Sequence, residues 1–324
     1  STWKRFRKES HFQISAEDNG RFVTVVTPAR NPKLSTRAGG IIWSLLTVLL
    51  VRKYIRTYGR PDLIHAHFGT WAGYAARLVY KWYKIPYVIT EHASSINGNQ
   101  TTPSQAVILK KAYSEARKII CVGTKLKRSL CAYVSDPDKV TVIPNFVDTN
   151  TFAFSPHRTE KEKHFTFISI GNLNKRKGFW DLLTAFHWAF KDMPHVSLII
   201  AGDGEEMQSL KEQIQSLHLQ EQVKLTGRLS REELSGLLAT CDAFVLASFA
   251  ETFGIVFIEA MATGLPAIGT VCGGPEDIIT PESGFPIRPG NVDALAAKMK
   301  TLYDTYESFD KEKIRQSIVS RFDF

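Results

Sequence analysis

The feature that most constrains the fold is an alternating pattern of predicted strands and helices along almost the whole chain. Short apolar runs of strand length alternate with longer helical patterns, and the alternation starts again near residue 165. This alternation predicts parallel sheets covered by helices. The chain has 324 residues, which favours two domains over one. We therefore expect an α/β protein with two Rossmann-like domains in tandem and a ligand-binding cleft between them.

The first half contains five strand candidates and four helix candidates. The expected strands are 21–27, 63–66, 87–90, 118–122 and 140–143, and the expected helices are 40–58, 71–83, 104–115 and 124–133. A polar stretch from Asn145 to Lys163 follows and predicts a linker. We therefore place an N-terminal domain at 1–147 and a C-terminal domain at 148–324.

The second half repeats the pattern with shorter strands. The expected strands are 165–170, 196–201, 223–225, 243–246 and 267–268, and the expected helices are 179–190, one after Gly204, and 254–264. Ser230 is the expected N-cap of a further helix, with Glu233 completing a capping box. The two halves therefore predict similar architectures.

The net charge and the cysteine spacing limit which classes of binding partner are expected. The formal net charge is +9, with basic clusters at 3–8 and 52–60, which favours anionic partners such as nucleotides or phospholipid surfaces. No nucleic-acid-binding motif is present, so we expect no nucleic-acid partner. The four cysteines lack metal-ligand spacing and predict reduced core thiols of a cytoplasmic protein.

The apolar run Ile41–Val51 is about half as long as a membrane span requires. Basic residues follow it within 52–60. Two interpretations stay open for this segment. It is either a helix packed on a sheet or a basic amphipathic helix that faces a membrane.

Two carboxylates flank an apolar run in the segment from Glu251 to Glu259. Glu251 would lie in the loop after a strand, and Glu259 would lie within the following helix. The amides of Phe253, Gly254 and Ile255 would be free at the helix start, which suits an anion such as phosphate. The alternative is a capped core helix with two solvated glutamates.

Two glycine loops could face the same ligand. The strand that ends at Ile170 is followed by Gly171, three cations that include Arg176 and Lys177, and Gly178. Cations and free amides together suit a diphosphate, although a solvated basic loop is equally compatible. Gly202-Asp203-Gly204 could turn over a nucleotide. The turn at Arg228 could meet a base edge or serve only as a helix cap.

Histidines occur at the ends of two expected strands of the first half. His92 follows the strand 87–90 and could bond a hydroxyl or a phosphate, or be a structural histidine. His65 and His67 would share one strand face. No third ligand is evident beside them, so we expect no metal.

Several motifs occur together in one order, and the chain resembles the family 4 retaining glycosyltransferases, which have the GT-B fold. The motifs are 64–67, 90–92, 144–148, 171–178, 202–204, 251–259 and 273–276. The resemblance runs from about Pro61 to the C-terminus. It implies a glycosyltransferase that uses a UDP- or GDP-sugar, needs no metal or other cofactor, and makes surface polysaccharide or glycolipid.

The resemblance also implies roles for individual residues. Lys177 would bind the donor diphosphate, Glu251 the sugar hydroxyls, and His92 the transferred sugar. Glu259 would bind the ribose, and the remaining donor-binding residues would be Asn172, Arg176, Gly204, Arg228, Phe253, Gly254 and Ile255. Many members have arginine where this chain has Asn172, so one expected phosphate cation is replaced. Arg176 or Lys175 would substitute for it.

The basic first domain suggests a glycan or lipid-linked acceptor, with the protein peripheral at the cytoplasmic face of the inner membrane. Relative to the family, the first strand and its glycine-rich loop are expected to be missing, and the last crossover helix is expected to be cut short. The replacement at Asn172 leaves one alternative open, a sugar-nucleotide-binding protein without catalysis. A GT-B epimerase or phosphorylase is the other.

Overall fold

The computed structural model describes residues 11–17, 20–26, 37–98, 100–154 and 164–324, with the backbone alone for 11–26. The chain forms two compact units, and each is described by itself. The first unit holds residues up to His92 together with 101–120 and 130–141. The second holds 93–100, 121–129 and 142–324. The predicted boundary at 147 stays a prediction, and the basic cluster at 3–8 lies outside the described residues.

The first unit is built on a four-stranded sheet in the order β3-β4-β5-β6, in which β3 and β4 are parallel. Its strands are β3 (Ile64–His67), β4 (Tyr87–Glu91), β5 (Lys118–Cys121) and β6 (Val140–Val142). Its helices are α2 (Arg37–Tyr58), α3 (Trp71–Tyr83) and α5 (Pro103–Ser114). A separate antiparallel pair consists of β1 (His11–Glu17) and β2 (Gly20–Val26).

The second unit contains a six-stranded parallel sheet in the order β12-β11-β10-β7-β8-β9. The strands are β7 (Phe165–Ile170), β8 (Val196–Ala201), β9 (Val223–Gly227), β10 (Ala243–Leu246), β11 (Ala267–Thr270) and β12 (Gly284–Ile287). Counted from β7, this is the strand order of a Rossmann sheet, in which the direction of winding reverses between β7 and β10. The reversal point marks where such sheets bind ligands.

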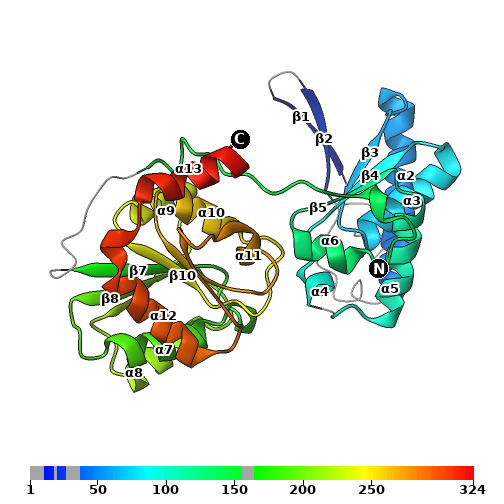
Figure 1. Ribbon diagram of the computed structural model, residues 1–324. Coiled ribbons are helices and arrows are strands. Elements are labelled where there is room, and N and C mark those ends of the chain that lie inside the picture. Colours follow the sequence, from blue (N-terminus) through cyan, green and yellow to red (C-terminus); the bar gives the residue numbers. More distant parts are fainter. Residues whose placement is uncertain (1–10, 18–19, 27–36, 99, 155–163) are drawn as a thin grey trace. The chain divides into compact units, whose positions relative to one another are not determined.

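Helices cover both faces of this sheet. They are α7 (Phe179–Phe190), α8 (Met207–Ser216), α9 (Arg231–Leu238), α10 (Ile255–Ala262), α11 (Pro275–Ile278), α12 (Val292–Asp304) and α13 (Lys311–Phe322). Figure 1 shows α7, α8 and α12 on one face and α9, α10 and α13 on the other. The second unit also includes α4 (Ser94–Asn97) and most of α6 (Thr124–Leu130). Every residue of β7, β10 and β11 is buried, as expected for strands covered on both faces.

The expected linker is in part a packed segment. Val147 and Phe152 are fully buried, and the Val147 amide donates to the Phe322 carbonyl over 2.9 Å. The Arg315 guanidinium donates to the carbonyl oxygens of Thr149, Phe152 and Ala262. The prediction of a linker over 145–163 was therefore wrong for 147–152, because a polar sequence there hides two buried apolar side chains. Residues 155–163 lie outside the described part.

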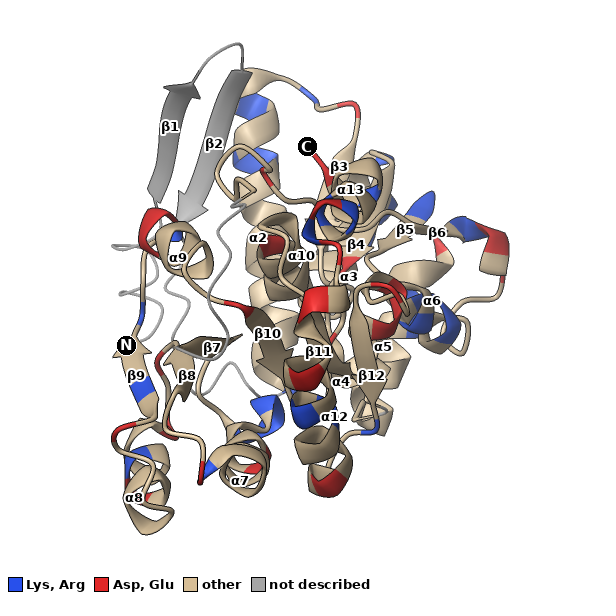
Figure 2. Ribbon diagram, turned by 60° about the vertical axis from the view of Figure 1, so that its left-hand side comes forward, with Lys and Arg blue, Asp and Glu red and all other residues tan. Residues whose placement is uncertain are grey.

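Helix α2 was predicted over 40–58, and it extends beyond the apolar run 41–51 at both ends. It begins at Arg37 and ends at Tyr58, and its buried residues are Gly39, Gly40, Ser44 and Val48. Among the described residues, it is the one helix whose length and composition would allow it to cross a membrane. It packs against α3, where the Ser44 hydroxyl donates to the Trp71 carbonyl. Lys and Arg residues of the chain are blue in Figure 2.

Most predicted elements coincide with observed ones. The bounds of α3, β7, α7, β8 and β10 are those predicted. The capping box of Ser230 and Glu233 is also confirmed, with both hydrogen bonds formed. Strands β1 and β12 and helices α12 and α13 are among the elements that were not predicted, because their mixed polar and apolar residues gave no clear signal.

Candidate donor site

The carboxyl ends of β7 and β10 carry the loops in which most predicted donor-binding residues lie. The loop after β7 forms a short 3-10 helix, η3 (Lys175–Lys177), and the loop after β10 leads through Glu251 to α10. The two strands are neighbours in the sheet, so their loops are adjacent. This is the point at which the winding reverses, where open α/β sheets place their ligands.

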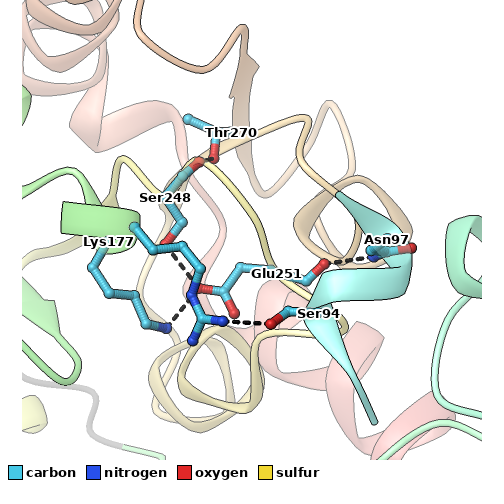
Figure 3. Close-up of polar contacts among 7 residues, drawn as sticks. Ser94, Asn97, Lys177, Ser248, Glu251 and Thr270 are labelled. Carbon is cyan, nitrogen blue, oxygen red and sulfur yellow. Dashed lines mark hydrogen bonds and ion pairs between the residues drawn. The ribbon is translucent and has the colours of Figure 1, made fainter. Parts of the chain in front are cut away.

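Lys177 and Glu251 form an ion pair at this point. Lys177 Nζ lies 2.6 Å from Glu251 Oε1, and the two side chains are 13% and 11% exposed. The Ser248 hydroxyl donates to the same carboxylate oxygen over 2.7 Å. Figure 3 shows these contacts. A partly buried pair of this kind is well ordered and keeps a cation next to the start of α10.

Neighbouring polar groups hold Glu251 and its loop in place. The Thr270 hydroxyl donates to the Ser248 carbonyl, which ties the loop to the end of β11. The Asn97 side chain donates to the Glu251 carbonyl over 2.6 Å, as Figure 3 also shows. Asn97 lies in residues 93–100, which belong to the second unit. Glu251 is therefore fixed through both its carboxylate and its backbone.

Close backbone contacts explain two of the glycines at this end of the sheet. A Cβ atom at Gly178 would lie 2.2 Å from the Ala247 carbonyl oxygen, and one at Gly202 would lie 1.8 Å from that of Gly171. Gly178 also has a φ of +67°. Only glycine satisfies both constraints. These contacts let the loops after β7, β8 and β10 pack against one another.

The start of α10 presents free amides beside the ion pair. Gly254 caps the helix with a φ of +90°. Within the described part of the chain, the amides of Phe253, Gly254 and Ile255 have no hydrogen-bond acceptor. A helix N-terminus with free amides attracts an anion. Lys177 and these amides together provide the positive potential that a phosphate group requires.

Glu259 lies within α10 and already has a partner. Arg231 donates to Glu259 Oε1 over 3.2 Å, and the Arg231 guanidinium also lies over the Phe152 ring. Burial raises the pKa of Glu259, while Arg231 acts in the opposite direction. Glu259 is thus a buried acceptor whose single cation is mostly exposed.

The remaining predicted donor-binding residues lie on exposed turns. Arg176 is exposed and donates to the Ser94 hydroxyl, while the Asn172 side chain is exposed. The Gly204 amide donates to Asp203 Oδ1 over 2.8 Å. Arg228 is exposed and follows the left-handed Gly227. Their roles stay predictions.

His92 belongs to a cluster of histidines in the first unit. His67 Nδ1 lies 3.1 Å from His92 Nε2, and the rings of His65 and His67 stack at 4.6 Å. Burial and the neighbouring His67 lower the pKa of His92. The buried Glu91 carboxylate accepts from the amides of His92 and Gly69. The predicted shared face of His65 and His67 is confirmed, and His92 is a third member that the sequence analysis did not connect to them.

The side chains that hold Glu251 and Glu259 in place could not be recognised from residue type alone. Ser248, Thr270, Asn97 and Arg231 were not predicted as site residues. Ser248 lies three positions before Glu251, which is a local signal, but Asn97 is 154 positions away from it. Among the described residues, no group of three or more His, Cys, Asp or Glu is placed to hold a metal ion. Three of the four free cysteines are buried.

Comparison with known proteins identifies the class. Residues 151–316 match the family described as Glycosyl transferases group 1, and residues 14–151 match Glycosyltransferase Family 4. The chain belongs to these glycosyltransferases and has the GT-B fold.

Individual relatives are distant. The chain is 28% identical over 275 residues to a glycogen synthase of Mycobacterium tuberculosis, covering 82% of this chain and 66% of that protein. It is also 28% identical to the putative teichuronic acid biosynthesis glycosyltransferase TuaC of Bacillus subtilis, covering 81% of this chain and 67% of TuaC. The crystal structure of Anabaena HepE in complex with UDP matches with a TM-score of 0.75 at 23% identity, covering 85% and 78% of the two chains.

Proposed function

We propose that this chain transfers a sugar from a UDP- or GDP-sugar to a glycan or lipid-linked acceptor, with retention of anomeric configuration and without a metal ion. The observation that carries the proposal is the Lys177–Glu251 pair, with 2.6 Å between Nζ and Oε1, beside the free amides that begin α10. Membership of the glycosyltransferase families supports it.

The donor would bind across the carboxyl ends of β7 and β10. Its diphosphate would lie against Lys177, the cation of the pair with Glu251, and against the amides of Phe253, Gly254 and Ile255, which have no acceptor within the described part of the chain. Glu251 would accept hydrogen bonds from sugar hydroxyls, and Glu259 from the ribose. The UDP in the HepE complex supports a uridine nucleotide as the first donor to test.

The reaction breaks the bond between the anomeric carbon and the β-phosphate oxygen. A bond forms between that carbon and an acceptor hydroxyl oxygen on the same face, and the hydroxyl proton passes to the departing phosphate. Negative charge grows on the leaving nucleoside diphosphate. Lys177 and the α10 amides stabilise that charge because they are already oriented toward it. These fixed positive groups would take the place of a divalent cation, and Arg176 would add a second charge.

The exposed apolar side chains of α2 and the basic residues that follow them support an acceptor held at a membrane. Helix α2 exposes Ile42, Leu45 and Leu49, and the basic residues of 52–60 follow them. An exposed apolar face next to cations suits the surface of an anionic bilayer. TuaC, a relative of this chain, is named for teichuronic acid biosynthesis. We therefore propose that the protein works at the cytoplasmic face of the membrane as a peripheral enzyme, making surface polysaccharide or glycolipid.

Co-sedimentation with vesicles tests the membrane part of this proposal. Binding to phosphatidylglycerol vesicles should exceed binding to phosphatidylcholine vesicles and should decrease as salt increases. Equal binding to the two lipids would rule out recognition of an anionic surface.

Turnover tests the reaction itself. The chain is incubated with UDP- and GDP-sugars and a panel of glycan and lipid acceptors, with and without EDTA. We expect release of a nucleoside diphosphate, a product with the anomeric configuration of the donor by NMR, and no effect of EDTA. Inversion of configuration or loss of turnover in EDTA would contradict the corresponding part of the proposal.

One observation favours a second candidate, a sugar-nucleotide-binding protein without catalysis. The position where many family members have a phosphate-binding arginine holds Asn172, whose side chain is exposed. Donor binding without transfer to any acceptor would support this candidate, and transfer would exclude it.

A further inference from the structure

A hollow of about 500 Å³ lies on the second unit beside η3. Its lining includes Lys175, Trp180, Asp181, Glu206 and Phe249, but neither Lys177 nor Glu251. The residues come from η3 and from the beginnings of α7 and α8, together with the loop after β10. The volume falls within the range of small-molecule binding sites. Apart from Lys175, which the resemblance names with Arg176 as a candidate for the missing phosphate cation, no residue of this hollow has a role in the proposed transfer reaction.

Glu206 provides the first sign that the hollow binds a ligand. The residue is 6% exposed, and within the described part of the chain its Oε2 atom has no hydrogen-bond partner. Burial raises the pKa of its carboxyl group, although Lys175 acts in the opposite direction. Leaving a buried carboxylate oxygen without a partner is costly, so native proteins rarely do it without a reason. Glu206 lines the hollow, and a ligand hydroxyl that donates to its carboxylate would reduce this cost.

Aromatic rings in the lining provide a second, independent sign. Trp180 is 44% exposed and Phe249 is 47% exposed. The position of Phe249 is fixed because its amide donates to the Arg176 carbonyl over 2.8 Å. Large aromatic side chains usually bury their surface, and a pair of them lining one hollow offers flat apolar faces to a ligand.

The charges of the lining restrict the chemistry of that ligand. Lys175 disfavours a cation, while Asp181 and Glu206 disfavour an anion. A neutral polyol satisfies all three, since its hydroxyls both donate to carboxylates and accept from an ammonium group. A sugar ring also has an apolar face of C–H groups that packs on an aromatic ring.

We propose that this hollow is a binding subsite for a neutral saccharide, separate from the nucleotide-binding site. Hydroxyls of the saccharide donate to Glu206 and Asp181, and its apolar face packs on Trp180 and Phe249. The same turn, η3, directs Lys175 to this subsite and Lys177 to Glu251. The subsite therefore holds a glycan chain next to the donor loop.

Saccharide binding without nucleotide tests the proposal and does not depend on turnover. Maltotetraose, cellotetraose and N-acetylchitotetraose are titrated into the chain, with tryptophan fluorescence and saturation-transfer NMR as readouts. We expect at least one of them to bind. Trp180→Ala should weaken that binding by about tenfold, because the stacking contact is lost. Glu206→Gln should also weaken it, because an amide accepts hydrogen bonds less strongly than a carboxylate.

Two matched variants control for general effects. Trp188→Ala removes another exposed tryptophan of α7 that is not in the lining, and Glu205→Gln neutralises the exposed neighbour of Glu206. Both should bind the saccharide as the unchanged protein does. Glu206→Gln should also retain or raise the melting temperature, because it removes a buried carboxylate that lacks a partner.

Several results would overturn the proposal. These are no binding of any of the three saccharides, an equal loss in Trp180→Ala and Trp188→Ala, and displacement of the saccharide by saturating UDP. Binding of tetramethylammonium in place of the saccharides would identify a cation site instead and would equally refute it. Failure of the transfer assay would leave each of these results interpretable, since no nucleotide is needed.

Discussion

The two strand ends that carry the predicted catalytic residues differ in their chemistry. In the second unit, Lys177 after β7 and Glu251 after β10 form a charged pair, and a hydroxyl and an asparagine hold Glu251 in place. In the first unit, the end of β4 holds His92 against His67, and burial lowers the pKa of His92. One site contains an ion pair, whereas at the other the lowered pKa of His92 favours its neutral imidazole. The difference teaches that the ion pair in the second unit suits the proposed diphosphate, whereas a neutral imidazole in the first unit suits an uncharged hydroxyl.

The largest predicted effect is the loss of folding stability when a glycine near these sites is replaced by alanine, because the atoms around each glycine differ. A Cβ at Gly202 would meet the backbone oxygen of Gly171 at 1.8 Å, whereas one at Gly69 would meet the Tyr113 hydroxyl at 2.4 Å. The backbone of Gly171 directly follows β7 and its amide donates to the Ala201 carbonyl of β8, so it cannot move as a side chain can. Gly202→Ala should therefore prevent folding of the second unit or lower its stability far more than Gly69→Ala does.

Urea unfolding followed by circular dichroism measures this difference. Gly236→Ala in α9 is the control, because a Cβ there meets nothing within 4 Å. That change should be neutral or stabilising by about 0.5–1 kcal/mol. Equal stability of Gly202→Ala and Gly236→Ala would show that the loops after β7 and β8 are not packed as described.

The charged pair should be energetically coupled, unlike the histidine pair. Lys177→Met or Glu251→Gln alone leaves a mostly buried partner uncompensated, at a cost of about 3–5 kcal/mol for such pairs. The double variant should cost clearly less than the sum of the single changes. His67→Asn combined with His92→Asn should show coupling of about 1 kcal/mol, the usual size for a hydrogen bond.

Double-mutant cycles from urea unfolding give both coupling energies. If the coupling energy of Lys177 and Glu251 were no larger than that of the two histidines, the energetic difference between the two sites would be contradicted.

The pH dependence of transfer should identify the histidine site. The pKa of His92 lies below the ordinary value of 6.5, first because of burial and then because of His67 and, in the last place, His65, while Glu91 acts in the opposite direction. Neutral His92 is therefore retained to a lower pH than an ordinary histidine would be. His67→Asn removes one of the charges that lower this pKa, so the acidic decline of kcat/KM should move to higher pH.

The free energy of unfolding should also decrease as the pH falls. A lowered histidine pKa means that the unfolded chain binds more protons, so stability is present above pH 6.5 and is lost as the pH falls through the folded value. His218→Asn is the control, because His218 is exposed and its φ of +55° is one that asparagine tolerates. If the pH dependence of stability and of kcat/KM were unchanged in His67→Asn, His67 would not influence the pKa of His92.

The smallest effect is expected at Arg231. Its side chain is 60% exposed, whereas Glu259 is 10% exposed, so their pair is largely screened by solvent. Arg231→Gln should lower the free energy of unfolding by about 0.2–1 kcal/mol, as for exposed pairs. It should also raise the pKa of Glu259 further, because Arg231 is the group that opposes the effect of burial. Urea titrations at pH 5 and pH 7.5 check both effects, and a loss as large as that of Lys177→Met would contradict them.

The sequence was most informative where local pattern and tertiary structure agree. Strand β7, the glycine turn after it and helix α7 follow from an apolar run, a left-handed glycine and a helical pattern, and all were predicted. The loop with Glu251 was predicted because its carboxylates interrupt an apolar run. The packed segment 147–152 was not, because its burial depends on Arg315 and α13, more than 160 residues away.

The candidate site shows the same limit. Lys177 and Glu251 were predicted from their separate motifs, but their contact depends on the neighbouring positions of β7 and β10 in the sheet. Asn97 and Thr270 could not be found from residue type, since neither has an unusual local pattern. The partner of His92 was hidden because β3 and β4 pair in a register that places His67 beside Thr90. Sequence patterns located the residues, and strand order brought them together.

The most direct test of the central claim compares two lysines of the same turn. Lys177 contacts Glu251, whereas Lys175 lines the separate hollow. Isothermal titration calorimetry measures the affinity of the unchanged protein, Lys177→Met and Lys175→Met for UDP, GDP and the corresponding nucleosides. We predict that one diphosphate binds more tightly than its nucleoside, that Lys177→Met removes this advantage, and that Lys175→Met retains it. Equal losses in the two variants, or no preference for the diphosphate, would contradict the claim that the nucleotide binds at the Lys177–Glu251 pair.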